Sequence, residues 1–156
     1  MKTFFFEKEI YIDLAVPEVF DFFSRAENLE KVTPRQLQFQ ILTPLPIDMK
    51  AGSIIDYKLK VHHIPVSWQT EISEWNPPHR FTDIQVKGPY RKWIHQHIFE
   101  KSGNGTRMKD LLEYAIPGGF LSSIINQVLV RKDIESIFIY REKRYREIFQ
   151  IKSDYE

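Results

Sequence analysis

The order of hydrophobic and polar residues predicts a sheet framed by helical segments. Over residues 3–12, bulky β-forming residues alternate between two faces, which is typical of a half-buried strand. Pro17 then suits the first turn of a helix, and Val16, Val19, Phe20 and Phe23 follow at helical spacing. A second short helix is predicted over residues 27–32, because the following proline would end it.

Between residues 36 and 116 the apolar positions recur every second residue and turn signals separate the runs. The pattern predicts six strands, over residues 36–42, 53–62, 66–75, 80–86, 92–101 and 106–116. The connections between them are short, which predicts an antiparallel meander. The sequence Ser-Gly-Asn-Gly at residues 102–105 predicts a tight hairpin between the last two strands.

From residue 117 the period becomes helical and stays so to about residue 149. A helix of about 30 residues is about 45 Å long, so it must lie across another element. Packing it on the concave side of a curved, seven-stranded sheet would bury both apolar faces. We therefore expect one α+β domain over residues 1–156, with a cavity between sheet and helix that aromatic side chains line.

Composition narrows the classes of function. The chain has 156 residues and a net charge of +1, which removes the strongest argument for a nucleic-acid binder and favours a neutral or apolar ligand. The absence of cysteine excludes disulfides, a thiolate nucleophile and a Cys-ligated zinc. No apolar run approaches the roughly 18 residues of a membrane span, so a cytoplasmic protein is expected by elimination. The content of 12 Phe, 7 Tyr and 3 Trp is high and is consistent with a lined cavity.

Three stretches carry a resemblance to a known superfamily. They are residues 12–22 (Ile-Asp-Leu-Ala-Val-Pro-Glu-Val-Phe-Asp-Phe), the aromatic and histidine pattern of 88–99, and residues 105–117. Together with the predicted order of strands and helices, these stretches resemble the START-like or SRPBCC superfamily. That superfamily has the helix-grip fold of the birch-pollen allergen. The nearest branches are ligand-binding proteins close to polyketide cyclases/dehydrases and coenzyme-Q-binding proteins. The resemblance implies binding of a lipid-, polyketide- or quinone-like molecule, but this scaffold hosts several functions.

Candidate chemistry centres on one predicted strand. Trp93, His95, His97 and Phe99 alternate along it and therefore share a face. If the hairpin turns at residues 103–104, Asp110 lies opposite His95 or His97. A carboxylate beside an imidazole can orient it as an acid or base, and the same pair can equally be a satisfied structural contact.

A metal site is not expected. His95 and His97 could share an ion, but zinc needs three or four ligands. His62 and His63 point to opposite faces of their strand, so both cannot contribute. No cofactor is expected either. Neither a serine nucleophile with its base nor a glycine-rich phosphate loop accompanies the histidines.

The residues expected to contact the ligand occupy inward positions on strands or on the long helix, except Phe120 and Leu121, which are expected at the mouth of the cavity. They are Tyr57, Leu59, Trp68, Trp93, His95, His97, Phe99, Met108, Asp110, Leu112, Tyr114, Phe120, Leu121, Ile124, Ile125 and Val128. The resembled fold implies that residues 62–65, 87–90 and 117–120 frame the mouth of the cavity. The charged run over residues 141–147 is expected to be a solvated helix face.

Three functions remain open. A carrier of a small hydrophobic ligand is the leading one. The second is a cyclase- or dehydratase-like enzyme that uses His95, His97 and Asp110. The third is a protein-interaction module, which would have a filled interior and an exposed apolar patch. The oligomeric state does not follow from the sequence.

Overall fold

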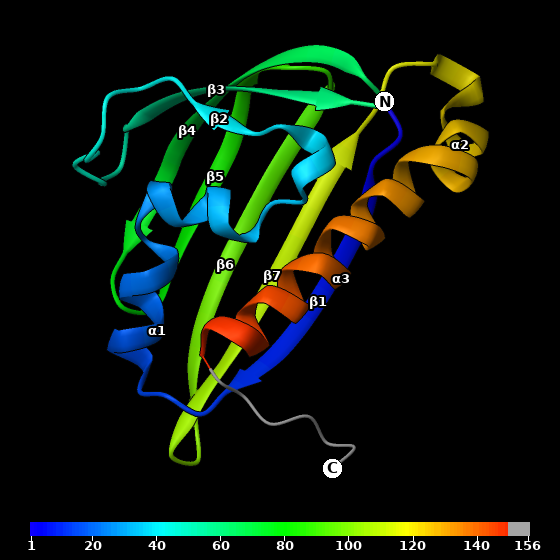
Figure 1. Ribbon diagram of the computed structural model, residues 1–156. Helices are drawn as coiled ribbons and strands as arrows, with labels where there is room; N and C mark the ends of the chain where they lie inside the picture. The colour runs from blue at the N-terminus through cyan, green and yellow to red at the C-terminus, as the bar shows by residue number, and fades with distance from the viewer. Residues whose placement is uncertain (150–156) are drawn as a thin grey trace.

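An antiparallel sheet curves around a C-terminal helix in the computed structural model, which describes residues 1–149 (Figure 1). Within these residues the sheet has seven strands in the order β1-β7-β6-β5-β4-β3-β2. Their bounds are β1 Phe4–Ile12, β2 Gln40–Ile41, β3 Ile54–Val61, β4 Ile64–Asn76, β5 Arg80–Lys87, β6 Lys92–Ser102 and β7 Gly105–Ala115. The predicted strand number and meander are confirmed, and β1 adds to the meander by pairing with β7.

Short helices connect β1 to β2. They are α1 (Val16–Phe23) and two 3₁₀ helices, η1 (Ala26–Val32) and η2 (Arg35–Leu37). The predicted strand over residues 36–42 is therefore wrong for its first half, and only β2 pairs with β3. The physical reason lies at Gln38, where a left-handed backbone ends η2 and delays the extended segment.

The predicted long helix is confirmed as a helical course in four segments. These are η3 (Gly119–Leu121), α2 (Ser122–Ile125), the π-helical η4 (Asn126–Val130) and α3 (Arg131–Ile148). Gly118 redirects the chain after β7 with φ of 122°, a conformation that side chains disfavour. A Cβ there would lie 2.7 Å from Ile125 Cδ1, so a side chain at this position would also have to displace the end of Ile125.

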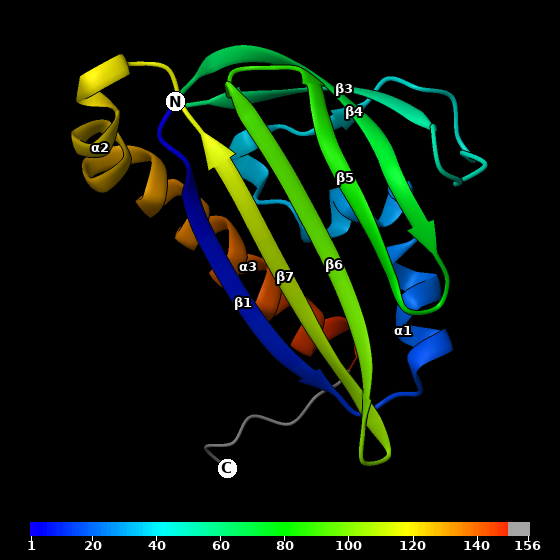
Figure 2. The same cartoon turned by 180° about the vertical axis from the view of Figure 1, so that it is seen from behind.

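The helices lie on the concave side of the sheet, while the opposite face carries none of the helices of residues 1–149 (Figures 1 and 2). Two apolar clusters pack beneath α3. The cluster next to α1 includes Phe20, Phe99 and Tyr145, and the cluster toward α2 includes Tyr114 and Phe138. Polar side chains of β5, β6 and β7 lie between these clusters, and they form the candidate site. No helix among the described residues has both the length and the apolar character to cross a membrane.

Candidate functional site

Four ionisable side chains meet at the centre of the concave face. Asp83 lies on β5, His95 and His97 on β6, and Asp110 on β7. The strand register pairs His97 with Asp110 and His95 with Asp83. The predicted juxtaposition of Asp110 with a histidine is thus confirmed, and Asp83 is a member that the sequence prediction missed. These four residues are called the His–Asp cluster below.

Each imidazole of the His–Asp cluster lies between two carboxylates. His95 Nε2 is 2.8 Å from Asp110 Oδ1, and His97 Nε2 is 2.7 Å from Asp83 Oδ2. The second contacts are longer, 3.8 Å from His95 Nδ1 to Asp83 and 3.4 Å from His97 Nδ1 to Asp110. His95 and Asp110 are each 5% exposed, and the other two side chains are 12% and 17% exposed. The network is therefore largely withdrawn from water.

Burial and mutual charge set different protonation states for the two histidines. Burial lowers the pKa of His95, and the charge of His97 lowers it further. Burial also acts to lower the pKa of His97, but the neighbouring Asp110 and Asp83 carboxylates outweigh it and raise the pKa to about 9. For Asp110 and Asp83, burial would raise the pKa, yet the imidazoles hold both carboxyls below their ordinary range. Near neutral pH the cluster thus holds two carboxylates, one imidazolium and one neutral imidazole.

Arg141 reaches the same region from α3. The buried positions of α3 include Ile134, Phe138 and Tyr145, so Arg141 falls in the middle of the inward stripe. Its guanidinium carbon is 5.4 Å from the centre of the Phe138 ring, and its Nε is buried without a hydrogen-bond partner. Its positive charge contributes to the lowered pKa of Asp83. The prediction of a solvated face over residues 141–147 is wrong for Arg141.

Four other charged residues of that run form salt bridges, as predicted. Glu142 pairs with Lys8 and with Arg146, and Arg144 pairs with Glu147. Arg141 could not be distinguished from these neighbours in the sequence, because only the packed orientation of α3 shows which residue of the run faces the sheet.

A half-open aromatic wall adjoins the His–Asp cluster. Trp68 on β4 contacts Tyr57 on β3 and Trp93 on β6, with ring centroids 6.2 and 5.2 Å apart. These three side chains and Leu59 lie on the concave face but remain only partly buried. Tyr57 Oη shares a hydrogen bond with Thr70. The aromatic wall therefore provides apolar surface beside the charged and largely buried His–Asp cluster.

Four other predicted ligand contacts are core residues. Phe99, Met108 and Leu112 are 2%, 1% and 2% exposed, and Tyr114 is fully buried. Tyr114 Oη donates to Asn126 Oδ1 at 2.6 Å, which ties the sheet to η4. These side chains fill the two apolar clusters and leave little surface for a ligand.

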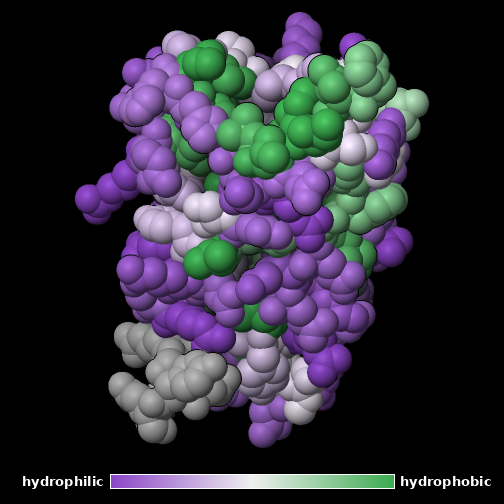
Figure 3. All heavy atoms as spheres, turned by 90° about the vertical axis from the view of Figure 1, so that its right-hand side faces the viewer, coloured by the Kyte–Doolittle hydropathy of each residue, from purple (hydrophilic) through white to green (hydrophobic). Residues whose placement is uncertain are grey.

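The helical residues predicted to line the cavity lie mostly on the outside. Phe120 is 93% exposed, Ile124 and Val128 are each 59% exposed, and Leu121 is 46% exposed. The prediction that Ile124 and Val128 face inward is wrong, whereas Ile125 packs against the cluster around Tyr114. Phe120 and Leu121 were expected at the mouth of the cavity, and their exposure does not contradict that position. The physical reason is that residues 117–130 contain no charged side chain, so their sequence does not indicate which face of the helix is exposed to solvent. Figure 3 shows hydrophobic residues gathered at the upper end of this face.

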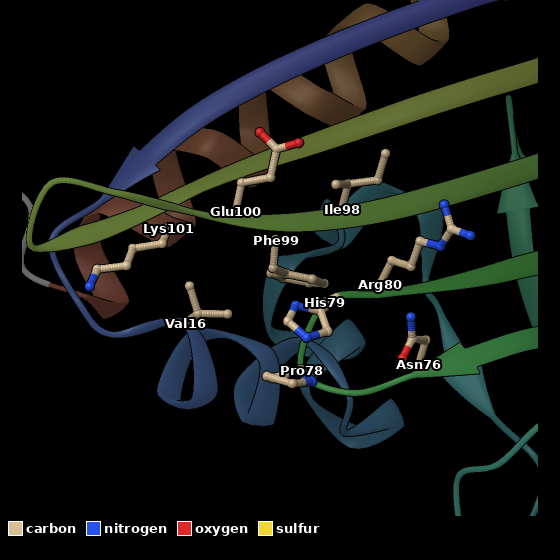
Figure 4. A pocket seen from close by; sticks show the side chains of 9 residues that line it. All are labelled: Val16, Asn76, Pro78, His79, Arg80, Ile98, Phe99, Glu100 and Lys101. Carbon is tan, nitrogen blue, oxygen red and sulfur yellow. The ribbon is translucent and has the colours of Figure 1, made fainter.

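A separate groove opens near α1. It has a volume of about 590 Å³ and lies where α1, the β4–β5 turn and β6 meet (Figure 4). Its lining includes Val16, His79, Arg80, Phe99 and Lys101. Of the predicted ligand contacts only Phe99 is among them, so this groove is distinct from the wall described above.

Asp83, His95 and His97 also offer donor atoms that could hold a metal ion. One ligand atom of each lies within 4.8 Å of the others. In the structure these side chains form the imidazole–carboxylate contacts of the cluster. His62 lies far from them in the β3–β4 turn, with its Nε2 2.9 Å from Asp133 on α3.

Comparisons with known proteins agree with this architecture. A family model described as "Polyketide cyclase / dehydrase and lipid transport" matches residues 12–136. A search of curated proteins finds no match. The solved structure of TTHA0849 from Thermus thermophilus is similar, with 18% identity, a TM-score of 0.65, and 90% of this chain and 95% of that chain covered.

Two plant proteins share the fold as well. Ginseng major latex-like protein 151 from Panax ginseng has 11% identity and a TM-score of 0.68, covering 94% of this chain and 97% of that one. Norcoclaurine synthase from Thalictrum has 13% identity and a TM-score of 0.66, covering 94% and 96%. At such identities the likeness establishes the helix-grip fold alone.

Proposed function

Because the chain belongs to the polyketide cyclase/dehydrase and lipid transport family, we propose that it binds a small, largely hydrophobic molecule between the sheet and α3. The bound molecule is lipid-, polyketide- or quinone-like. Its apolar body lies against Tyr57, Leu59, Trp68 and Trp93, which keep exposed surface on the concave face. The His–Asp cluster and Arg141 hold its polar end. The binding is driven by apolar burial, and the polar groups set the orientation.

The observation that carries this proposal is the unpartnered Arg141 beside a buried network of charges. A guanidinium has donors only, so the group that meets it must be an acceptor such as a carbonyl or carboxylate oxygen. Arg141 Nε is buried and has no such partner among residues 1–149. Buried polar atoms are usually hydrogen-bonded, and each exception calls for an explanation. A ligand oxygen supplies the missing partner.

The proposal is tested by fluorescence titration with anilinonaphthalene sulfonate, an apolar probe with an acidic group. We expect saturable binding that Arg141→Gln weakens about tenfold, since a hydrogen bond to a charged group contributes roughly 1.5–3 kcal/mol. Arg146→Gln is the matched control, because Arg146 pairs with Glu142 on the same helix. Trp68→Ala should also weaken binding, whereas Phe120→Ser, at an exposed site, should not. Absence of saturable binding, or equal affinity in Arg141→Gln, would contradict the proposal.

An enzymatic role is the second candidate, and the unequal histidines favour it. His95 is held neutral and can accept a proton, while His97 is held charged and can donate one. A cyclase- or dehydratase-like reaction needs both functions beside an apolar chain. Turnover of a polyketide-like substrate that is unchanged in His95→Gln and His97→Gln would exclude this role for the cluster.

A further inference from the structure

An apolar patch covers one end of the molecule, away from the His–Asp cluster. It consists of Ile64, Phe120, Leu121, Ile124, Val128 and Leu129. Ile64 is 65% exposed, and the other five range from 44% to 93%. The helical members come from η3, α2 and η4 (Figures 1 and 3). Contiguous exposed apolar residues of this kind mark an interaction surface.

The segments around the apolar patch meet at one end of the fold. The β3–β4 turn is joined to α3 by His62 and Asp133 at 2.9 Å. The N-terminal segment is joined to α2 by a hydrogen bond from Lys2 Nζ to Ser123 Oγ at 2.7 Å. Tyr90, from the β5–β6 loop, packs on the same cluster as Ile125. Figures 1 and 2 both place these loops at the upper end of the sheet.

These segments are basic without exception. Residues 1–3, 60–65, 86–92 and 117–132 contain seven of the chain's 22 Lys and Arg residues and none of its 21 Asp and Glu residues. The remaining residues therefore carry 15 basic against 21 acidic side chains. The seven basic residues are Lys2, Lys60, Lys87, Arg91, Lys92, Arg131 and Lys132. The net charge of +1 is therefore the sum of a basic end and an acidic rest of the chain.

Most of this positive charge is available to a partner. Three acidic residues adjoin this end, and each is already engaged: Glu113 with Lys92, Glu135 with Arg131, and Asp133 with His62. Within residues 1–149, the other five basic side chains have no carboxylate within 4.0 Å. The basic residues therefore complement a negatively charged surface.

We propose that this end docks on the surface of an anionic lipid bilayer, with the apolar patch inserted among the headgroups. Such docking requires apolar side chains that enter the upper roughly 5–10 Å of the bilayer and basic residues that attract anionic lipid. Both are present here on the same end. A nucleic acid would meet the basic residues but not the aliphatic centre of the patch, which has a single aromatic ring. The inference stands on the protein surface and does not depend on what the interior binds.

The test is sedimentation of the full-length protein with vesicles of phosphatidylcholine alone or of equal parts phosphatidylcholine and phosphatidylglycerol. We expect binding to the mixed vesicles and little to the neutral ones. Phe120→Ser/Ile124→Ser should weaken binding at least about tenfold, because two exposed apolar groups no longer leave water. Ile139→Ser is the matched control, since Ile139 is 65% exposed but lies along α3, outside the patch.

A second pair of variants tests the charge. Lys87→Glu/Lys132→Glu should weaken binding at least about 25-fold, at about fivefold per basic residue near an anionic surface. Lys101→Glu/Lys143→Glu changes the net charge equally at exposed positions outside the basic segments and should have a smaller effect. Absence of vesicle binding, or equal loss in target and control variants, would overturn the proposal. A dimer that Phe120→Ser/Ile124→Ser dissociates would assign the patch to a second copy and would also overturn it.

Discussion

Raising the pH should destabilise the protein through His97. Its pKa is about 9 in the fold against an ordinary value of 6.5. A group whose pKa is raised by folding stabilises fully below its unfolded pKa, and that contribution is lost as the pH rises through the folded value. The window is therefore about pH 6.5 to pH 9. At about 1.4 kcal/mol per pKa unit, the contribution of His97 to the free energy of unfolding is about 3 kcal/mol.

This magnitude depends on the groups that face His97 from each neighbouring element. They are Asp83 on β5, His95 on β6 and Asp110 on β7, and Arg141 on α3 acts on Asp83. The two carboxylates favour the imidazolium, and burial opposes it. Both carboxyls are ionised throughout the window because their pKa values are lowered, so the slope reports the imidazole.

Urea unfolding across this pH range measures the effect. The free energy of unfolding of the wild type should fall by about 3 kcal/mol between the two ends of the window. His97→Gln should remove most of that slope, whereas His79→Gln, at an exposed position in the β4–β5 turn, should keep it. A wild-type stability that is flat or rises with pH would refute the assignment of the imidazolium to His97.

Three further substitutions probe how the site is supported. Asp110→Ala should cost about 3–5 kcal/mol in urea unfolding, because it leaves buried imidazoles without one of their two carboxylates; a loss below about 1 kcal/mol would show that the network is not stabilising. Tyr114→Phe should cost about 1–3 kcal/mol by leaving Asn126 unpaired, and an unchanged melting temperature would count against that bond. Gly118→Ala should lower the melting temperature more than Gly119→Ala, since only the first would press a Cβ on Ile125.

Much of the sheet followed from local pattern. Alternation with period two depends only on the extended backbone, so β3 to β7 appear in the sequence close to their observed bounds. The two-residue turn between Ser102 and Gly105 sets the β6–β7 register, and this register places Asp110 opposite His97. The pairing of His97 with Asp110 could therefore be predicted from two neighbouring strands and the short turn between them.

The position of Asp83 in the His–Asp cluster could not be predicted in the same way, because it depends on how β5 packs and pairs. Asp83 occupies a strand with apolar residues on both faces, Phe81 and Ile84 among them, so the alternation did not show which face is inward. The register of β4 against β5 also shifts twice, which no turn signal indicates. Asp83 joins the cluster only because β5 pairs with β6 in the observed register.

The sequence by itself determined the strands, the long helix, the paired His97 and Asp110, and hence the fold class. Tertiary structure alone decided the rotation of the C-terminal helix. That rotation brings Arg141 to the sheet and turns Phe120 and Ile124 to the outside. The physical reason is that the sheet selects the buried side of a helix by packing. In a charged run such as 141–147, or an uncharged run such as 117–130, the local sequence does not indicate which side of the helix is buried.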